Sequence, residues 1–119
     1  MTQPEKPVVV LNPRAAGGQA ARRWIEIQEA FKRRLGVSVT LRTTEHPGHA
    51  TALTRNALET GSKLVIAIGG DGTVNEVANG FLQNDEAVSA DARLGFVPIG
   101  TGGDLQRTLG ISSSIEQAV

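Results

Sequence analysis

The chain has 119 residues, a length that suits one domain with one modest core. Its 12 Lys and Arg balance its 12 Asp and Glu, and aromatic residues make up 3%, so neither a basic nucleic-acid surface nor a base-stacking platform is indicated. The sequence has no Cys, which excludes disulfides and Cys-based metal sites. No apolar run approaches the roughly 20 residues of a membrane span, and residues 1–10 lack a signal-peptide pattern. We therefore expect a cytoplasmic protein that does not bind nucleic acid.

The first third of the chain predicts a strand, a loop and a long helix. Residues 7–11 are apolar, largely β-branched, and stop at Asn12-Pro13, where proline ends a strand's hydrogen bonding. Residues 15–18 are expected to continue that loop. A helix follows and ends at Gly36, a suitable C-cap, because apolar side chains recur at helical spacing: Ala20, Trp24, Ile27, Phe31 and Leu35.

The rest of the chain predicts three more strands. Alternation over 37–42 indicates a half-exposed strand, and residues 43–48 read as a loop. The continuous apolar run over 64–68 is typical of a central strand buried on both faces. The other expected elements are a helix with apolar residues over 50–57 closed by Gly61, a helix over 74–81, a polar loop over 83–91, a strand over 94–99 and a short helix over 104–109.

This alternation predicts an α/β fold with three layers, α/β/α, around a mostly parallel sheet. We assign residues 1–119 to one domain, and we expect the chain to belong to a longer protein, because Ser112 to Ser114 offer N-caps to a helix that has only begun. In such a sheet, ligands bind at the carboxyl ends of the strands. Four loops are expected to leave those ends, over 12–18, 43–48, 69–73 and 100–104.

The loop over 69–73, Gly-Gly-Asp-Gly-Thr, is typical of a phosphate-binding turn. Glycine lets a ligand approach backbone N–H groups closely, and the N-terminus of the following helix favours anions. Neither the P-loop pattern nor G-x-G-x-x-G is present. The carboxylate of Asp71 would repel a phosphate by about 4 kcal/mol per charge pair. Two functions would justify it, holding Mg²⁺ or accepting a hydroxyl proton, and a plain Asp-Gly turn is the alternative.

Other polar side chains also have a structural and a functional interpretation. Thr73 and Glu76 match a capping box, which accounts for both without a ligand, whereas Asn75 has no such explanation and is expected to touch the ligand. His46 and His49 favour a role in a polar loop or at the ligand's edge over a metal pair, because no Cys or third His completes a site. One predicted helix carries a basic set that is either a solvated face or a membrane-surface patch: Arg22, Arg23, Lys32, Arg33 and Arg34.

The segment GGDGTVNEVANG at 69–80 resembles the signature of the diacylglycerol kinase catalytic-domain family, which includes bacterial lipid kinases and sphingosine kinases. Three further segments resemble motifs of that family in the same order: NPRAAGG at 12–18, TTEHPGHA at 43–50 and PIGTGGDLQRTLGI at 98–111. The core GGDGT is shared with NAD kinases. The resemblance covers nearly the whole chain and favours the lipid-kinase branch.

The resemblance implies an ATP- and Mg²⁺-dependent kinase that transfers the γ-phosphoryl group to a diacylglycerol-like or sphingoid hydroxyl. It implies a nucleotide and a lipid acceptor as partners, the latter at the inner membrane surface, where a cytoplasmic protein would bind peripherally; a homo-oligomer is left open. Asp71 would serve the metal or the chemistry. The implied nucleotide-binding residues are Asn12, Pro13, Arg14, Ala15, Ala16, Thr44, Gly69, Gly70, Gly72, Thr73, Asn75, Glu76, Thr101 and Asp104.

Two positions depart from the family pattern, since Gly103 replaces an Asn and Ala15 replaces a Ser. Family members also carry a second, β-rich domain that supplies much of the acceptor pocket, so the 119 residues alone are expected to be inactive. Two alternatives therefore stay open: an NAD kinase-like phosphotransferase, and a nucleotide-binding regulatory module without catalysis.

Overall fold

The computed structural model describes residues 6–36 and 38–98. The described elements, in chain order, are β1 (Val8–Leu11), α1 (Ala15–Arg22), α2 (Trp24–Leu35), β2 (Thr40–Thr43), α3 (His49–Glu59), β3 (Leu64–Gly69), α4 (Asp71–Gly80), β4 (Leu82–Gln83), β5 (Glu86–Ala87) and β6 (Arg93–Pro98). The expected helices at 104–109 and after 112, and the end of the strand at 99, lie outside the described residues.

The main sheet has the strand order β2-β1-β3-β6, and every neighbouring pair is parallel. Residues 64–69 of β3 are buried at all six positions, because β1 and β6 flank that strand and helices cover both faces. The continuous apolar run therefore does mark the centre of the sheet, and the α/β fold is confirmed.

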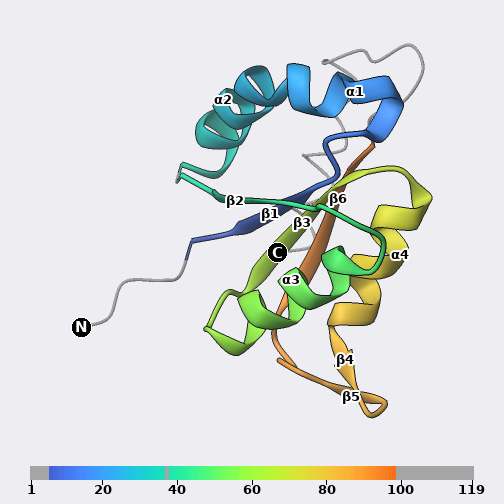
Figure 1. Cartoon of the computed structure of the whole chain (residues 1–119). Coiled ribbons are helices and arrows are strands. Elements are labelled where there is room, and N and C mark those ends of the chain that lie inside the picture. The colour runs from blue at the N-terminus through green and yellow to red at the C-terminus, as the bar shows by residue number, and fades with distance from the viewer. Residues whose placement is uncertain (1–5, 37, 99–119) are drawn as a thin grey trace.

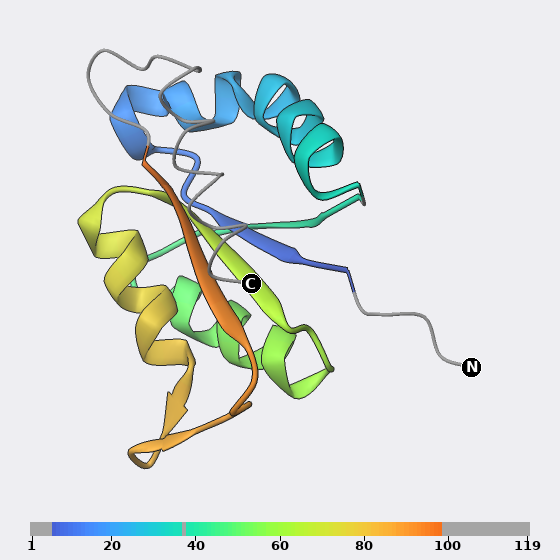
Figure 2. The same ribbon diagram turned by 180° about the vertical axis from the view of Figure 1, so that it is seen from behind.

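Helices cover the sheet on both sides, and Figures 1 and 2 show α1 and α2 on one face and α3 and α4 on the other. Alternate strand residues supply the two cores. Val9, Leu11, Ile66 and Ile68 pack with Ala20, Ile27 and Phe31 of the α1–α2 layer. Val8, Val10, Val65 and Ala67 pack with Ala50, Ala57, Leu58 and Val77 of the α3–α4 layer. The sheet is thus the middle of three layers.

The chain changes direction across the sheet after β1. It runs from β1 through α1 and α2 to β2 on one side, then returns through α3 to β3 on the other side of β1. The loops that follow β1 and β3 consequently leave toward opposite faces of the sheet. Such a reversal opens a crevice at the carboxyl ends of the strands, where α/β proteins bind ligands.

The long helix after β1 begins earlier than the sequence predicts and is interrupted. Residues 15–18, expected in the loop, belong to α1, and Gly17 and Gly18 adopt left-handed φ values of 66° and 92° there. Arg23 separates α1 from α2, although the N–H of Arg23 still donates to the carbonyl of Gln19. The apolar stripe continues from α1 into α2, because the interruption involves Arg23 alone. Gly36 is a left-handed C-cap with φ of 74°, as predicted.

Two further predictions of secondary structure need correction. The strand expected over 37–42 is Thr40–Thr43 among the described residues, so it extends into the expected loop. The polar loop expected over 83–91 contains a short antiparallel hairpin of β4 and β5. Asn84 and Asp85 turn it with positive φ values of 53° and 64°. Strands of two residues are too short for the alternation that reveals a strand in a sequence.

Candidate functional site

A cavity of about 240 Å³ lies where the loops after β1, β2 and β3 converge. Its lining residues come from these loops, from the first turn of α3 and from the first two turns of α4: Asn12, Arg14, Thr44, Glu45, His46, Pro47, Ala50, Gly72, Thr73 and Glu76. The carboxyl ends of these strands were the expected location of a site. The structure thus brings Asn12, Arg14, Thr44, Gly72, Thr73 and Glu76 of the predicted set together.

Backbone hydrogen bonds fix the loops after β1 and β2 relative to the sheet. The N–H of Asn12 donates to the carbonyl of Ile68 at 3.0 Å, and the N–H of Thr44 donates to the carbonyl of Leu11 at 2.9 Å. The Oδ1 atom of Asn12 accepts from the N–H of Arg14 at 3.0 Å, which turns the chain toward α1. Asn12 therefore shapes its own loop, and that loop presents Arg14 to the cavity.

Gly69 and Thr73 pack tightly against each other at the end of β3. A Cβ atom on Gly69 would lie 2.5 Å from Oγ1 and 2.9 Å from Cβ of Thr73, closer than any side chain tolerates. Thr73 is 7% exposed, so its side chain fills the space that glycine leaves. The fold itself requires glycine at position 69, because a larger residue would push α4 away from the strand.

The capping box predicted for Thr73 and Glu76 is wrong. Helix α4 begins at Asp71, with Gly70 as its N-cap, and no side chain caps it by a hydrogen bond. Thr73 is consequently the third residue of the helix, and Glu76 lies a further turn along, too far to reach the N-cap amide. Both side chains line the cavity instead.

The first turn of α4 offers unshielded backbone N–H groups beside the cavity. Gly70 and Gly72 are exposed, and a Cβ atom added to either would meet no atom within 4 Å. Folding therefore does not require glycine at these two positions, in contrast to Gly69. The absence of side chains leaves the positive end of the helix dipole open to an anion such as a phosphate.

Asp71 is the first residue of α4 and is exposed, next to Gly72 in the cavity wall. Within the described residues its carboxylate has no hydrogen-bond or ion-pair partner, so none of those residues neutralises its charge. A negative charge in the first helical turn is itself favourable to the helix. Its place at the rim leaves the carboxylate available to a metal ion or to a reacting hydroxyl.

The other predicted residues lie around the cavity or outside the described part of the chain. Pro13 is half-buried between the two polar residues of its loop, and Ala15 and Ala16 open α1; neither Pro13 nor Ala15 lines the cavity. Asn75 is exposed on α4 and also lies outside the lining. Thr101 and Asp104 lie outside the described residues.

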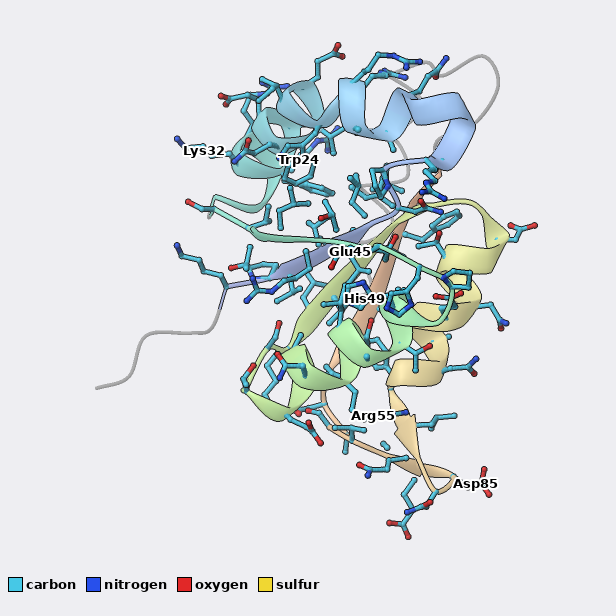
Figure 3. All side chains as sticks on the ribbon, in the orientation of Figure 1. Trp24, Lys32, Glu45, His49, Arg55 and Asp85 are labelled. Atoms are coloured by element: carbon cyan, nitrogen blue, oxygen red, sulfur yellow. The ribbon has the colours of Figure 1, made fainter. Side chains whose placement is uncertain are left out.

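The loop after β2 contributes a wall that the sequence analysis only partly anticipated. Glu45, Pro47 and Ala50 line the cavity without having been predicted as site residues, whereas His46 was expected at a ligand's edge. Figure 3 shows Glu45 and His49 close together at the junction of this loop and α3. Two signals in the sequence pointed to these residues: their position directly after a predicted strand, and their place in the segment TTEHPGHA at 43–50.

The two histidines of this loop stack on each other. Their ring centroids lie 4.6 Å apart with an interplanar angle of 14°. Nδ1 of His49 accepts from the N–H of Glu45 at 2.9 Å, and Nδ1 of His46 lies 2.9 Å from the carbonyl of Pro47, to which it can only donate. The stacking and these hydrogen bonds of the histidines thus stabilise the loop. Within residues 6–36 and 38–98, no group of three His, Asp or Glu side chains is placed to hold a metal ion.

Helices α3 and α4 are in close contact behind the cavity, through one hydrogen bond and at one glycine. Oγ1 of Thr51 donates to the carbonyl of Glu76 at 2.7 Å. A Cβ atom on Gly80 would lie 2.6 Å from Cβ of Thr54 and 2.8 Å from the carbonyl oxygen of Thr51. The two helices therefore approach closely along their length, and this contact fixes the direction in which the N-terminus of α4 points.

Comparison with known proteins identifies relatives over the same residues. Residues 6–119 match the family model described as diacylglycerol kinase catalytic domain. The chain is 34% identical over 119 residues to a protein from Enterobacter sp. (strain 638) named "Probable lipid kinase YegS-like", covering 99% of this chain and 37% of that protein. It is 32% identical over 112 residues to "Probable lipid kinase YegS" from Salmonella heidelberg (strain SL476), covering 94% and 36%.

The solved structures agree with this match. The crystal structure of a diacylglycerol kinase from Bacillus anthracis str. Sterne superimposes with a TM-score of 0.61 at 30% identity, over 99% of this chain and 41% of the other. The 119 residues thus span little more than a third of the length of these two curated relatives.

Proposed function

Since the chain belongs to the diacylglycerol kinase catalytic-domain family, we propose that it forms the nucleotide-binding part of an ATP-dependent lipid kinase. The proposed reaction breaks the bond between the γ-phosphorus of ATP and its bridging oxygen and forms a bond to the oxygen of a lipid hydroxyl, whose proton departs. Phosphoryl transfer of this kind depends mainly on positioning and charge neutralisation. The described residues offer both.

One observation carries this proposal: the uncapped N-terminus of α4 opens beside the cavity. Gly70 and Gly72 leave the first-turn amides accessible where no steric reason demands glycine. Arg14 faces the same cavity from the loop after β1 and adds a positive charge. Backbone amides and a guanidinium on two sides of one space fit a chain of phosphates.

The remaining lining residues fit the sugar and base of a nucleotide. Asn12, Thr44 and Glu76 present amide, hydroxyl and carboxylate groups that can hydrogen-bond to ribose hydroxyls, and the stacked His46 and Pro47 offer flat and apolar surface. We therefore place the phosphates at α4 and the nucleoside toward the loop after β2. The reverse orientation would set Glu45 against the phosphates and would cost Coulomb energy.

We propose that the carboxylate of Asp71 either binds Mg²⁺ or accepts the proton of the lipid hydroxyl. Mg²⁺ is held in such enzymes by one or two carboxylates together with phosphate oxygens, so a single exposed carboxylate at the phosphate end of the cavity fits it. The metal would neutralise charge that develops on the transferred phosphoryl group. Alternatively, the unpartnered carboxylate accepts the proton of the lipid hydroxyl. In this proposal, a region corresponding to the part of the relatives outside the match supplies the lipid-binding pocket.

Labelled ATP tests this function in a full-length protein that contains the 119 residues. We expect label to pass to diacylglycerol or a sphingoid base in mixed micelles when Mg²⁺ is present. Transfer to NAD alone would contradict the lipid assignment and favour the alternative branch. Nucleotide binding without transfer to any acceptor would instead support a regulatory module. The 119 residues alone should bind ATP and transfer nothing.

A further inference from the structure

We infer that the outer face of the α1–α2 layer is a docking surface for an anionic lipid bilayer. The inference rests on the proposed function for its purpose, since a lipid acceptor lies in a membrane, but its physical basis is separate from the cavity. No helix within the described ranges 6–36 and 38–98 has the length and apolar character to cross a bilayer, so the contact would be peripheral. Charge, exposure and one apolar side chain support it.

The charges of the chain are separated between the two helical layers. Residues 15–36, which contain α1 and α2, carry five Lys or Arg and two Glu, a net charge of +3. Residues 45–91, which contain α3, α4 and the hairpin, carry two Lys or Arg and seven Asp or Glu, a net charge of −5. The chain as a whole is neutral, so the separation is a property of the fold and not of the composition.

This separation orients the molecule near a negative surface. The sheet lies between the two layers, as Figure 1 shows, so the positive and negative layers face opposite directions. A bilayer rich in anionic lipid attracts the α1–α2 face and repels the α3–α4 face. One orientation is consequently favoured, and the side of the sheet that carries the net positive charge meets the lipid.

The outward side of α2 also presents an apolar contact. Ile27 and Phe31 are buried against the sheet, and Ile25 on the other side of the helix is 68% exposed. Lys32 and Arg33 are exposed along the same helix, and Figure 3 shows Lys32 projecting away from the sheet. An exposed isoleucine on a helix that also carries exposed cations suits the headgroup region, where the apolar side chain inserts and the cations meet phosphates.

Acidic side chains on the same helix limit the effect but do not cancel it. Glu26 lies 3.9 Å from the guanidinium of Arg23, so one of the two carboxylates is already balanced. Glu29 is exposed and opposes the attraction. The dipoles of α1 and α2 favour cations in the last turn of each helix, where Arg22 and Lys32 to Arg34 lie, but they do not explain the exposed Ile25.

Sedimentation with vesicles tests the inference without nucleotide. We expect the 119-residue chain to bind vesicles of phosphatidylcholine containing 30% phosphatidylglycerol and not vesicles of phosphatidylcholine alone. Binding should weaken as salt rises from 50 to 500 mM, because screening shortens the reach of the charges. Equal binding to both kinds of vesicle, or none to either, would overturn the proposal.

Matched variants locate the contact. Lys32→Glu with Arg33→Glu should weaken vesicle binding at least about 20-fold, because each lysine or arginine near such a surface contributes roughly fivefold. The control pair, Lys6→Glu with Arg42→Glu, changes charge by the same amount at exposed positions outside α1 and α2 and should have a much smaller effect. Equal losses in both pairs would show a net-charge effect and contradict a defined surface.

A second pair separates insertion from simple attraction. Ile25→Ser should weaken binding severalfold, whereas Leu82→Ser, at the other large apolar side chain exposed in the described residues (48%), should not. Binding to a DNA duplex as tight as that to anionic vesicles, with the same sensitivity at Lys32 and Arg33, would overturn a lipid surface in favour of a polyanion site. ATP affinity measured on the same variants should stay unchanged, so failure of the docking surface and failure of the nucleotide site remain distinguishable.

Discussion

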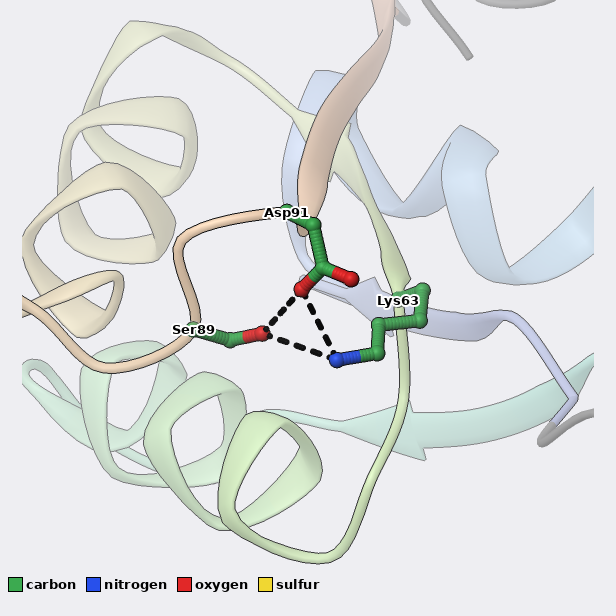
Figure 4. Close-up of polar contacts among 3 residues, drawn as sticks. All are labelled: Lys63, Ser89 and Asp91. Atoms are coloured by element: carbon green, nitrogen blue, oxygen red, sulfur yellow. Dashed lines mark hydrogen bonds and ion pairs between the residues drawn. The ribbon is translucent and has the colours of Figure 1, made fainter.

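Polar side chains pair with one another at the amino edge of the parallel sheet, whereas carboxylates at its carboxyl edge have no partner within the described residues. At the amino edge, where β3 and β6 begin, Lys63 donates to Asp91 at 2.8 Å and to Ser89 at 3.3 Å, and Ser89 donates to Asp91 at 3.1 Å. Figure 4 shows this closed triangle. At the carboxyl edge, the carboxylates of Asp71 and Glu76 have no such partner within the described residues.

That difference distinguishes polar groups that stabilise the fold from polar groups that are available to a ligand. The amino-edge groups satisfy one another, and the N–H of Arg93 donates to the carbonyl of Lys63 at 2.8 Å, so the cluster fixes β6 beside β3. The carboxyl edge keeps its amides, carboxylates and Arg14 open around a cavity. Polar groups that the fold leaves unpaired are available to a ligand, which is why this edge is the better candidate site.

The largest expected effect is on catalysis at Asp71. In the full-length protein, Asp71→Asn should lower phosphoryl transfer at least about 100-fold, since it removes the carboxylate that would hold Mg²⁺ or accept a proton. The melting temperature should change little because the side chain is exposed and unpaired within the described residues. The matched control is Asp85→Asn in the hairpin turn, which should leave the rate unchanged; equal losses at both positions would contradict the assignment.

A stability effect of about 1–3 kcal/mol is expected at Gly80. Gly80→Ala would place a Cβ atom 2.6 Å from Cβ of Thr54, so α3 and α4 would have to separate. Denaturant unfolding measures the loss, and ATP affinity should fall with it because α4 would tilt. A variant as stable as the wild type would mean that the close packing of these helices is not required.

The opposite pattern is expected at Gly72. Gly72→Ala meets no atom within 4 Å and should raise stability by up to about 1 kcal/mol through helix propensity. ATP affinity should nevertheless fall, because the added methyl group stands where phosphates would approach the amides. Calorimetry with ATP and Mg²⁺ checks this, and an unchanged affinity would contradict the binding of phosphates at the N-terminus of α4.

The smallest effect concerns the amino edge. Hydrogen bonds from Lys63 and Ser89 hold the pKa of Asp91 below its ordinary value of 3.8. The contribution to stability is therefore present above pH 4 and disappears as the pH falls through the lowered pKa. Asp91→Asn should lower the melting temperature slightly at pH 7, and the gap from wild type should close near pH 2. A gap that persists in acid would mean that charge is not the cause.

Patterns that depend on burial were predictable from the sequence. The run at 64–68 identified the central strand, and the phase of Val74, Val77 and Phe81 identified α4, because apolar spacing reflects the layers directly. The glycines at 69–72 pointed to the carboxyl edge of the sheet, where the cavity lies. These inferences needed only local sequence and the general rule that ligands bind at carboxyl ends.

Features set by a single residue's geometry were not predictable. Thr-x-x-Glu fits a capping box in sequence, but helix α4 begins three residues earlier than that box requires, at Asp71, and Gly70 is the N-cap. The break at Arg23 leaves the apolar period unchanged and so gives no signal. The wall formed by Glu45, Pro47 and Ala50 arises from the parallel pairing of β1 with β2, which brings their ends together.

Amide NMR of the 119-residue chain during titration with ATP and Mg²⁺ tests the central claim most directly, because both edges are observed in one experiment. The account predicts that shifts concentrate at residues 12, 14, 44–46 and 70–76 around the cavity and leave the amino edge, including Lys63, Ser89 and Asp91, unperturbed. Shifts centred on the amino edge, or no shifts at millimolar ATP, would contradict the claim that the open carboxyl edge is the nucleotide site.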